Sequence, residues 1–405
     1  MAQATTLSER HVGRALLPLG LVFLAVGIST ALVVPFLALF LNSEVAAGPL
    51  RVTVFLFVAP LSGVFVSWLI GRLSDRRAMR RGLLIAAALA GFAGAVLTAF
   101  IRDYWMLLGL AVTATALATS LFPQTFAYAR EVLQRDSPAR AAMGISSLRT
   151  VFSVAWVAGP PVGAALLQAG GFRYVYGVAA LTYLVAAAIA IFWLDSLGPA
   201  APSPAVETLV EPPPGAATSR WSLLLIAVAF TLLQCPLTLG AQALPLYVSR
   251  DLNGDIGDAG LLLGLCAGLE IPLMLAFGAL SIRIRVRTLI LAGAACGVAY
   301  YGIATSASAV GVLYPAQLVN ALFIAAVTGL GISYVQDLLP AEPGRATTLF
   351  TNTFPIGAML AGPLFGLAQQ FGFRLAFAIG SGLCLLGMLV LMTAPRLALP
   401  RARTG

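Results

Sequence analysis

The stretch Leu83–Ile101, LLIAAALAGFAGAVLTAFI, is a continuous apolar run without a charged residue. A helix needs about 20 predominantly apolar residues to cross the hydrocarbon core of a bilayer, and this stretch has that length. It lacks the alternation of polar and apolar residues that a transmembrane barrel strand requires. Because backbone groups in lipid must be hydrogen-bonded within the protein, the stretch predicts a transmembrane α-helix.

The rest of the chain has the same character. Of its 405 residues, 60% are hydrophobic and 10% are charged, which is far outside the composition of a soluble domain. Most of the outer surface is therefore expected to face lipid, in an all-α polytopic membrane fold. Apolar runs between charged or Pro/Gly breaks predict twelve helices. They cover about residues 16–41, 50–71, 82–101, 105–129, 141–168, 172–194, 221–248, 257–281, 288–307, 310–336, 345–370 and 372–394.

The first six helices are joined to the last six by a segment of different composition. Residues 195–220 contain APSPAVETLVEPPPGAAT, which is rich in proline, alanine and acidic residues. Such a composition is typical of a flexible linker. The expected organisation is a six-helix bundle over residues 1–195, a linker over 196–220 and a second six-helix bundle over 221–405.

The distribution of arginine predicts the orientation in the membrane. All 24 basic residues are arginine, and with the amino terminus inside, eighteen fall on the inner side and Arg149 falls within a span. The five on the outer side are Arg51, Arg102, Arg173, Arg250 and Arg374. Because cytoplasmic loops carry an excess of basic residues, both termini and the linker are expected in the cytoplasm. This topology explains the pI near 9.9 without a nucleic-acid partner.

Short motifs recur in the two sets of helices. Ala158-Gly159-Pro160 returns as Ala361-Gly362-Pro363, and Gly171-Phe172-Arg173 returns as Gly372-Phe373-Arg374. The offsets of 203 and 201 residues are close enough for one duplication with small insertions. The sequence therefore predicts two similar, parallel halves.

The loop between the second and third helices carries a further motif. It reads Gly71-Arg-Leu-Ser-Asp75-Arg76-Arg77-Ala-Met-Arg80-Arg81 and resembles the loop signature of the major facilitator superfamily. That resemblance implies two pseudo-symmetric six-helix bundles, a central site between them and alternating access. It also implies a gating role for Asp75 and Arg76, and Arg130 and Glu131 are expected at the same gate. The second-half counterpart, Gly278-Ala-Leu-Ser-Ile-Arg283, lacks the acid.

Four further segments resemble the bacterial sugar efflux transporter family. They are Ser147–Pro161, Gly268–Met274, Phe122–Gln124 and Tyr334–Pro340. Members of that family are proton-linked exporters of sugars and glycosides in bacterial inner membranes. The resemblance therefore implies a secondary active sugar exporter that exchanges its substrate for protons. The alternative is an exporter of drugs or other small metabolites with the same fold.

Two charged residues are expected deep in the membrane. Arg149 lies about eight residues into the fifth helix, and Glu270 lies about thirteen residues into the eighth, near the midplane. Because charges there are costly, they mark functional sites by default. Arg149, Ser153 and Trp156 share one helix face and offer a guanidinium, a hydroxyl and an aromatic plate to a sugar. The alternative is that Arg149 and Glu270 form a structural pair and that Trp156 only packs between helices.

Other polar residues of the same kind fall in the predicted helices. Amides and hydroxyls both donate and accept hydrogen bonds, as sugar hydroxyls require, although each could equally join two helices. These further candidates for substrate binding are Gln124, Tyr128, Gln234, Gln242, Gln317, Asn320 and Asn352. For proton coupling, Glu270 is the first candidate and Asp337 the second.

The sequence gives no sign of an enzyme. It contains no metal constellation, catalytic pair or nucleotide-binding loop, so neither a cofactor nor a metal is expected. The four cysteines lie in apolar segments without a pairing pattern. The expected partners are a small sugar, protons and the lipid bilayer, and the protein is expected to be a monomer.

Overall fold

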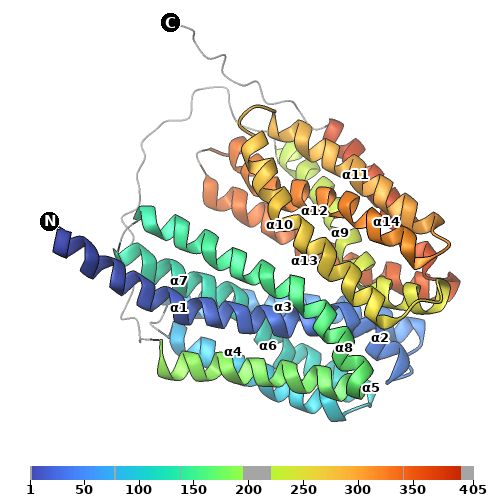
Figure 1. Ribbon diagram of the computed structural model, residues 1–405, viewed down its shortest axis with the longest axis horizontal. Helices are drawn as coiled ribbons and strands as arrows, with labels where there is room; N and C mark the ends of the chain where they lie inside the picture. Colours follow the sequence, from blue (N-terminus) through green and yellow to red (C-terminus); the bar gives the residue numbers. More distant parts are fainter. Residues whose placement is uncertain (1, 77–78, 137, 195–219, 341, 394–405) are drawn as a thin grey trace, which may run out of the picture.

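The computed structural model describes residues 2–76, 79–136, 138–194, 220–340 and 342–393, with the side chains of residues 17–73, 79–132, 148, 150–194, 220–340, 342 and 344–393. Over these ranges the chain forms helices and short connections, without a strand (Figure 1). The predicted all-α fold class is therefore confirmed. The predicted linker lies outside the described residues except for Arg220, which begins α9.

The helical segments fall into an amino-terminal and a carboxy-terminal group. The first group is α1 (Ala2–Val33), η1 (Val34–Phe36), α2 (Leu37–Ser43), α3 (Pro49–Arg76), α4 (Arg80–Phe100), α5 (Tyr104–Leu110), η2 (Ala111–Thr115), α6 (Ala116–Thr119), α7 (Leu121–Asp136) and α8 (Pro138–Phe192). The second group is α9 (Arg220–Asp251), α10 (Ile256–Leu280), α11 (Val286–Ser306), α12 (Val310–Leu338), α13 (Pro343–Phe371) and α14 (Arg374–Thr393).

These helices have the lengths of membrane spans. In the described part of the chain, ten segments are long and apolar enough to cross a bilayer. One of them, Thr150–Phe192, holds two helices, because α8 is interrupted at Gly170 and Gly171. A further long helix, α13, packs beside α9 and α3. The order of helices therefore agrees with the twelve predicted spans.

Two spans are less regular than the sequence predicts. The first is bent where the 3-10 turn η1, which contains Pro35, separates α1 from α2. Proline has no backbone N–H to continue an α-helix. The fourth consists of α5, the π-helical segment η2, α6, a turn at Ser120 and α7. Short π-helical segments are rare and occur frequently at functional sites.

Two glycine turns are equivalent in the two halves. Gly171 has φ 68° and Gly372 has φ 106°, a region of backbone conformation that favours glycine. Both begin the repeated Gly-Phe-Arg motif, and both follow the fifth span of their own half. The repeat predicted from the motifs is therefore present in the backbone.

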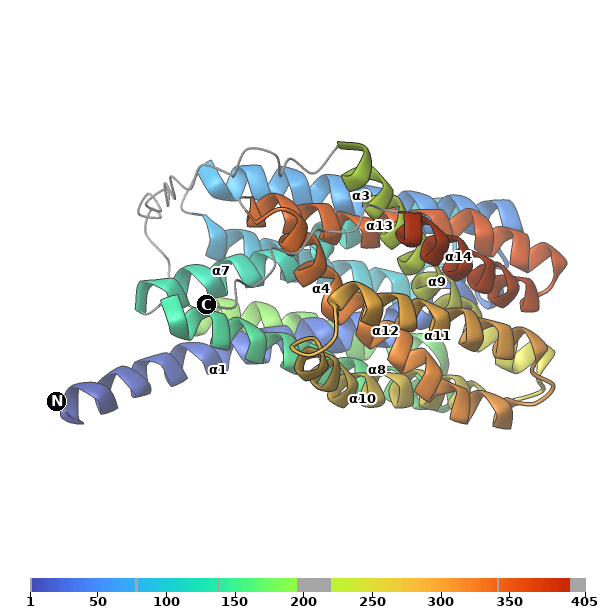
Figure 2. The same ribbon diagram turned by 90° about the horizontal axis from the view of Figure 1, so that it is seen from above.

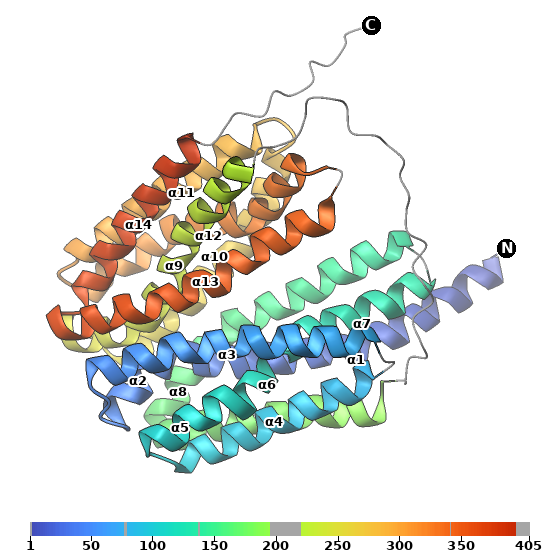
Figure 3. The same cartoon turned by 180° about the vertical axis from the view of Figure 1, so that it is seen from behind.

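The two bundles contact each other at one end, which we call the joined end. It carries the connections at residues 44–48, 101–103, 252–255 and 307–309. Figures 1 and 3 show the two bundles diverging from there toward the opposite, terminal end, where α9 begins and α14 ends. One hydrophobic cluster includes Phe40 and Leu56 of the first bundle together with the core of the second. The terminal part of the first bundle has a separate core around Phe23 and Leu148.

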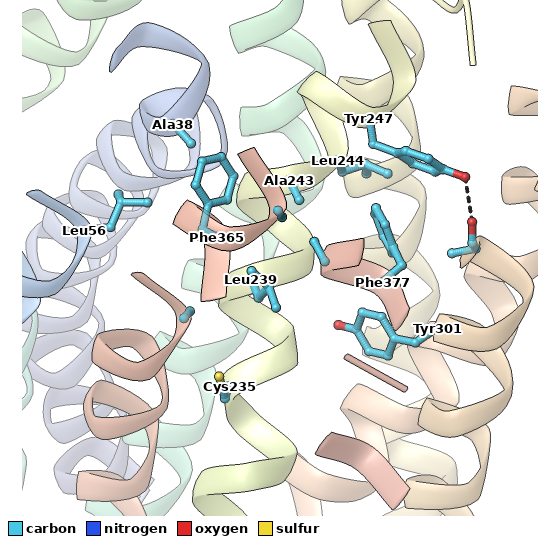
Figure 4. Packing of buried hydrophobic residues seen from close by; sticks show 14 of the residues in the cluster. Ala38, Leu56, Cys235, Leu239, Ala243, Leu244, Tyr247, Tyr301, Phe365 and Phe377 are labelled. Atoms are coloured by element: carbon cyan, nitrogen blue, oxygen red, sulfur yellow. Dashed lines mark hydrogen bonds between the residues drawn. The ribbon is translucent and has the colours of Figure 1, made fainter. Parts of the chain in front are cut away.

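The close-up in Figure 4 shows how the bundles meet at the joined end. Phe365 of α13 lies beside Leu56 of α3 and Ala38 of α2. Deeper in the second bundle, the Tyr247 hydroxyl donates a hydrogen bond to the Ala304 carbonyl at 2.7 Å. Figures 2 and 3 show α13 running alongside α3, so the shared core covers part of both bundles.

Glycines allow the bundles to approach closely. A Cβ atom on Gly260 of α10 would lie 2.7 Å from the backbone oxygen of Pro160 in α8. A Cβ atom on Gly264 would lie 2.7 Å from the backbone oxygen of Val157 in the same helix. A Cβ atom on Gly362 of α13 would lie 2.9 Å from the backbone nitrogen of Phe57 in α3. Since these distances leave no room for a side chain, both contacts between the bundles require glycine.

Polar contacts add to the joined end. Arg250 at the end of α9 donates a hydrogen bond to the Asn42 side chain of α2. The Gln369 amide of α13 donates to the Ala47 carbonyl at 3.2 Å. The Gln168 side chain at the end of the first part of α8 hydrogen-bonds Asp255 and, with the Gly257 N–H, lowers the pKa of that carboxyl. Three separate points therefore tie the bundles together near the membrane surface.

Candidate functional site

The site predicted from sequence lies between the joined end and the terminal end. The α8 residues Val157 and Pro160 contact glycines of α10. Ser153 comes one helical turn before Val157 and therefore lies on the same face of α8. It is half-buried, as is the neighbouring Trp156. The Arg149 side chain lies outside the described residues, so its substrate-binding role stays a prediction.

Glu270 is half-buried in α10 and faces α12. One turn before it, Cys266 accepts a hydrogen bond from the Asn320 amide of α12 at 3.3 Å. One turn after it, Met274 packs beside Gly329 of α12. Because residues four apart on a helix share a face, Glu270 is directed toward the same helix. It therefore lies on a different face of α10 from the glycines that contact α8.

A short chain of polar groups adjoins Glu270 within the second bundle. The Asn320 Nδ2 group donates to Gln317 Oε1 at 3.1 Å, and Gln317 Nε2 donates to the Tyr300 hydroxyl at 3.3 Å. The Asn320 Oδ1 atom is buried and has no hydrogen-bond partner in the described part of the chain. Since leaving a buried acceptor unpaired costs about 1–3 kcal/mol, this oxygen is suited to receive a donor such as a hydroxyl.

Of the three remaining buried amides among the predicted residues, one is paired and two have an unpaired oxygen. Gln234 of α9 donates to the Thr353 hydroxyl of α13 at 2.7 Å, so it joins two helices of the second bundle. The Oε1 atoms of Gln124 in α7 and Gln242 in α9 are buried without a partner among the described residues. Tyr128 is 2% exposed and belongs to the core cluster around Phe23.

Two of the residues predicted for substrate binding or proton coupling lie on exposed surfaces. Asn352 of α13 is exposed, and so is Asp337 in the last turn of α12. Asp337 lies at the terminal end, well away along the helix from Asn320. The structure therefore does not bring Asp337 together with Glu270 and the polar chain.

The residues expected at the gate lie at the terminal end of the first bundle. Glu131 Oε2 of α7 is 3.3 Å from Arg80 Nη1 of α4, and the same nitrogen donates to the Ala127 carbonyl at 3.0 Å. Arg130 is exposed. The side chains of Asp75 and Arg76 lie outside the described residues. A gating role for these four residues stays a prediction.

A group of aromatic side chains was not among the predicted site residues, although Phe122 and Phe152 lie in two of the segments that resemble the family. The centre of the Phe122 ring lies 4.9 Å from the ring centre of Phe126 in the same helix and 4.5 Å from the ring centre of Phe152 in α8. Phe152 is one turn before Trp156, so the predicted aromatic plate has aromatic neighbours along its own helix. The spacing of four between Phe122 and Phe126 was visible in the sequence, but it does not show that the rings meet Phe152.

A shallow pocket of about 400 Å³ lies elsewhere, at the joined end of the first bundle. Its lining includes Arg102, which is paired with Glu44 at 2.9 Å, and Arg173, whose guanidinium lies 5.8 Å from the centre of the Phe100 ring. None of the predicted substrate-binding residues lines it. Arg102 and Glu44 are engaged with each other and Arg173 lies over an aromatic ring, so the pocket does not resemble a substrate site.

The fold and the intramembrane polar groups together define a multi-pass membrane protein of two six-helix bundles, which is the architecture of secondary transporters. The family model of the Major Facilitator Superfamily matches residues 19–242 and again residues 226–404. The chain therefore belongs to the major facilitator superfamily, a family of transporters, as the loop motif predicted.

Relatives of known name support a narrower grouping. The chain is 36% identical over 391 residues to a putative sugar efflux transporter of Deinococcus radiodurans, covering 94% of this chain and 98% of the relative. It is 35% identical over 360 residues to sugar efflux transporter A of Escherichia coli, covering 87% and 89% respectively. The predicted resemblance to sugar efflux transporters is thereby confirmed.

Solved structures support the fold. The crystal structure of the nucleoside transporter NupG has a TM-score of 0.77 at 12% identity and covers 93% of this chain and 98% of its own. An inward-facing bacterial homologue of the iron transporter ferroportin has a TM-score of 0.66 at 18% identity, covering 94% and 97%. At these identities the likeness concerns the fold alone.

Proposed function

We propose that the protein is a secondary active transporter that exports sugars or glycosides across a bacterial inner membrane in exchange for protons. The observation that carries the proposal is the identity of about a third, over nearly the whole chain, to proteins named sugar efflux transporters. The polar groups on and beside the facing surfaces of the bundles fit a substrate with many hydroxyls.

The substrate-binding residues we propose fall into two groups by their surroundings. Ser153, Trp156, Asn352 and Glu270 retain exposed surface, and Arg149 belongs with them by helix position. Gln124, Gln242 and Asn320 hold buried oxygens available to a donor. Gln234 and Gln317 are buried within the second bundle and Tyr128 within the first, and we assign them the role of fixing the helices that carry the others.

The distribution of arginine suggests which side of the membrane each end faces. Arg72, Arg81, Arg283 and Arg287 all lie at the terminal end. Since basic residues accumulate in the cytoplasm, we propose that the terminal end and both termini are cytoplasmic. The bundles contact each other at the joined end, so the structure then corresponds to a carrier closed toward the periplasm. Residues 1–195 and 221–405 are the two rocking units in this proposal, with protons entering through Glu270.

Counterflow in proteoliposomes tests the substrate class. Vesicles that contain the purified protein and an excess of unlabelled lactose or glucose are expected to accumulate the labelled sugar transiently, with protein-free vesicles as the control. A panel of cationic drugs is measured in the same vesicles. Transport of drugs without any sugar counterflow would favour the drug exporter and contradict the proposal.

A further inference from the structure

Four phenylalanines from three helices form one connected aromatic cluster in the first bundle. Phe23 of α1 lies 4.4 Å from Phe126 and 5.9 Å from Phe122 of α7, between ring centres, and Phe122 lies 4.5 Å from Phe152 of α8. The interplanar angles of 55° to 84° are edge-to-face or tilted, as aromatic pairs prefer. Each ring is therefore held in place by at least one other.

The cluster is buried on one side and open on the other. Phe23 is 0% exposed, whereas Phe122 is 36% exposed and Phe126 and Phe152 are half-buried. The Phe122 ring touches α1 and α8, so it points toward the seam between these helices rather than away from the bundle into lipid. Figures 1 and 3 show α7 and the first part of α8 on the side of the first bundle that faces the second.

The second bundle has an aromatic cluster on the equivalent helices, but it is closed. Between ring centres, Phe230 of α9 lies 5.1 Å from Phe350 of α13 and 6.2 Å from Tyr334 of α12. These three rings are 0%, 7% and 3% exposed. Gly331 lies directly against the Phe350 ring, where a side chain would collide with it. An aromatic cluster that only packs helices can therefore be fully buried in this fold. The cluster of the first bundle differs because part of its surface, at Phe122, is exposed.

We infer that Phe122 and Phe152, supported by Phe126 and Phe23, form a stacking surface for the apolar face of a sugar ring. The inference rests on the proposed sugar transport and adds residues that determine specificity. A pyranose presents C–H groups on its faces and hydroxyls around its edge. The aromatic surface contacts the face, while Ser153, next to Phe152, lies within reach of the edge. An open-chain polyol has the hydroxyls but no ring face.

The test compares Phe122→Leu and Phe152→Leu with the wild type in glucose counterflow. Leucine keeps an apolar side chain but removes the aromatic face, so the KM for glucose is expected to rise about tenfold. Phe122→Tyr keeps the face and is expected to retain a KM within about twofold of wild type. Phe350→Leu, in the closed cluster, is the matched control, with lower thermal stability and an unchanged KM.

Binding measured without transport makes the test independent of turnover. Thermal protection of the purified wild type by glucose is expected to exceed that by sorbitol, and Phe122→Leu is expected to remove the difference. If both leucine variants transport glucose with the same KM as the wild type, the stacking surface is wrong, but the proposed function is not affected. A wild type that neither binds nor transports any sugar would overturn the proposed function and this inference with it.

Discussion

The contact between α8 and α10 and the contact between α13 and α3 occupy equivalent places in the internal repeat, but their residues are distributed differently. In the first, Gly260 and Gly264 of α10 meet the backbone of α8. In the second, Gly362 and Gly366 of α13 meet the backbone of α3. By the repeat, α10 corresponds to α3 and α13 to α8. A symmetric protein would therefore place glycine once in each bundle.

Here the second bundle supplies the glycines of both contacts, and the first supplies the surfaces they meet. Residues 49–57 of α3, PLRVTVFLF, contain no glycine. The duplication thus preserved the arrangement of helices while the contacting surfaces diverged. The closeness of the two bundles at the joined end is set by residues of one bundle, so substitutions there are expected to change the conformational equilibrium.

The largest effect is expected from Gly264→Leu, which breaks the α8–α10 contact. Its side chain would collide with Pro161 and the Val157 carbonyl, and overpacking of this kind costs about 1–3 kcal/mol. The closed joined end is then disfavoured by about fivefold to 150-fold. Counterflow is expected to fall by at least about fivefold, because the carrier closes less often on that side.

Cysteine labelling distinguishes this opening from misfolding. Ala164 is 0% exposed and faces Gly260 across the contact. In a variant with the four native cysteines replaced by alanine, Ala164→Cys is expected to react slowly with an impermeant maleimide and much faster when Gly264→Leu is also present. Gly278→Leu in the same helix is the matched control, since nothing lies within 4 Å of its Cβ position. Equal labelling in both variants would contradict a closure that depends on Gly264.

The next largest effect is expected from substitution of Glu270, because this acid makes the two bundles differ in charge. Glu270 is the acid that lies deepest in the predicted spans, and it belongs to the second bundle. Glu270→Gln keeps hydrogen-bonding capacity but cannot ionise, so uphill sugar export driven by a pH gradient is expected to be lost. Sugar exchange at equal pH is expected to remain within about threefold of wild type. Vesicles with and without an imposed gradient measure both, and full uphill transport in the variant would leave Glu270 a structural residue.

The smallest effect concerns the polar tie between the bundles at Gln168 and Asp255. The hydrogen bond from Gln168 lowers the pKa of Asp255 below its ordinary value of 3.8. The ionised carboxylate therefore stabilises the closed joined end above about pH 4, and this contribution is lost as the pH falls through the lowered pKa. Between pH 5 and 8 the tie is expected to be independent of pH.

Labelling of Ala164→Cys measures this tie. Gln168→Ala is expected to raise the labelling rate by less than about threefold, because Asp255 is exposed and water replaces the lost donor. Because maleimide reacts with the thiolate, whose fraction rises with pH, rates are compared with and without Gln168→Ala at the same pH. The ratio of the two rates is expected to be equal at pH 5 and pH 8. A clearly different ratio at pH 5 would point to another titrating group at the joined end.

The sequence predicted the helices well because long apolar runs and glycine or charged breaks decide where a chain leaves the bilayer. The irregular fourth span was not predicted, since Ala111–Thr115, AVTAT, has nothing in its composition that distinguishes a π-helical turn from an α-helical one. At the site, the motifs selected polar residues but not their direction. Gln234 and Gln317 are bonded within the second bundle because packing sets the rotation of each helix.

The π-helical turn η2 allows the fourth span to hold one additional residue without rotating the part of the span beyond it. Each residue of an α-helix advances the chain by about 100° around the axis, and a π-helical turn accommodates one residue more than an α-helical turn. A one-residue deletion in Ala111–Thr115 would restore a regular α-helical turn over about the same rotation, so the part of the span beyond it would keep its direction. Phe122 and Gln124 would then face the neighbours they have now. The same deletion in a regular part of the span would instead rotate both residues by about 100°.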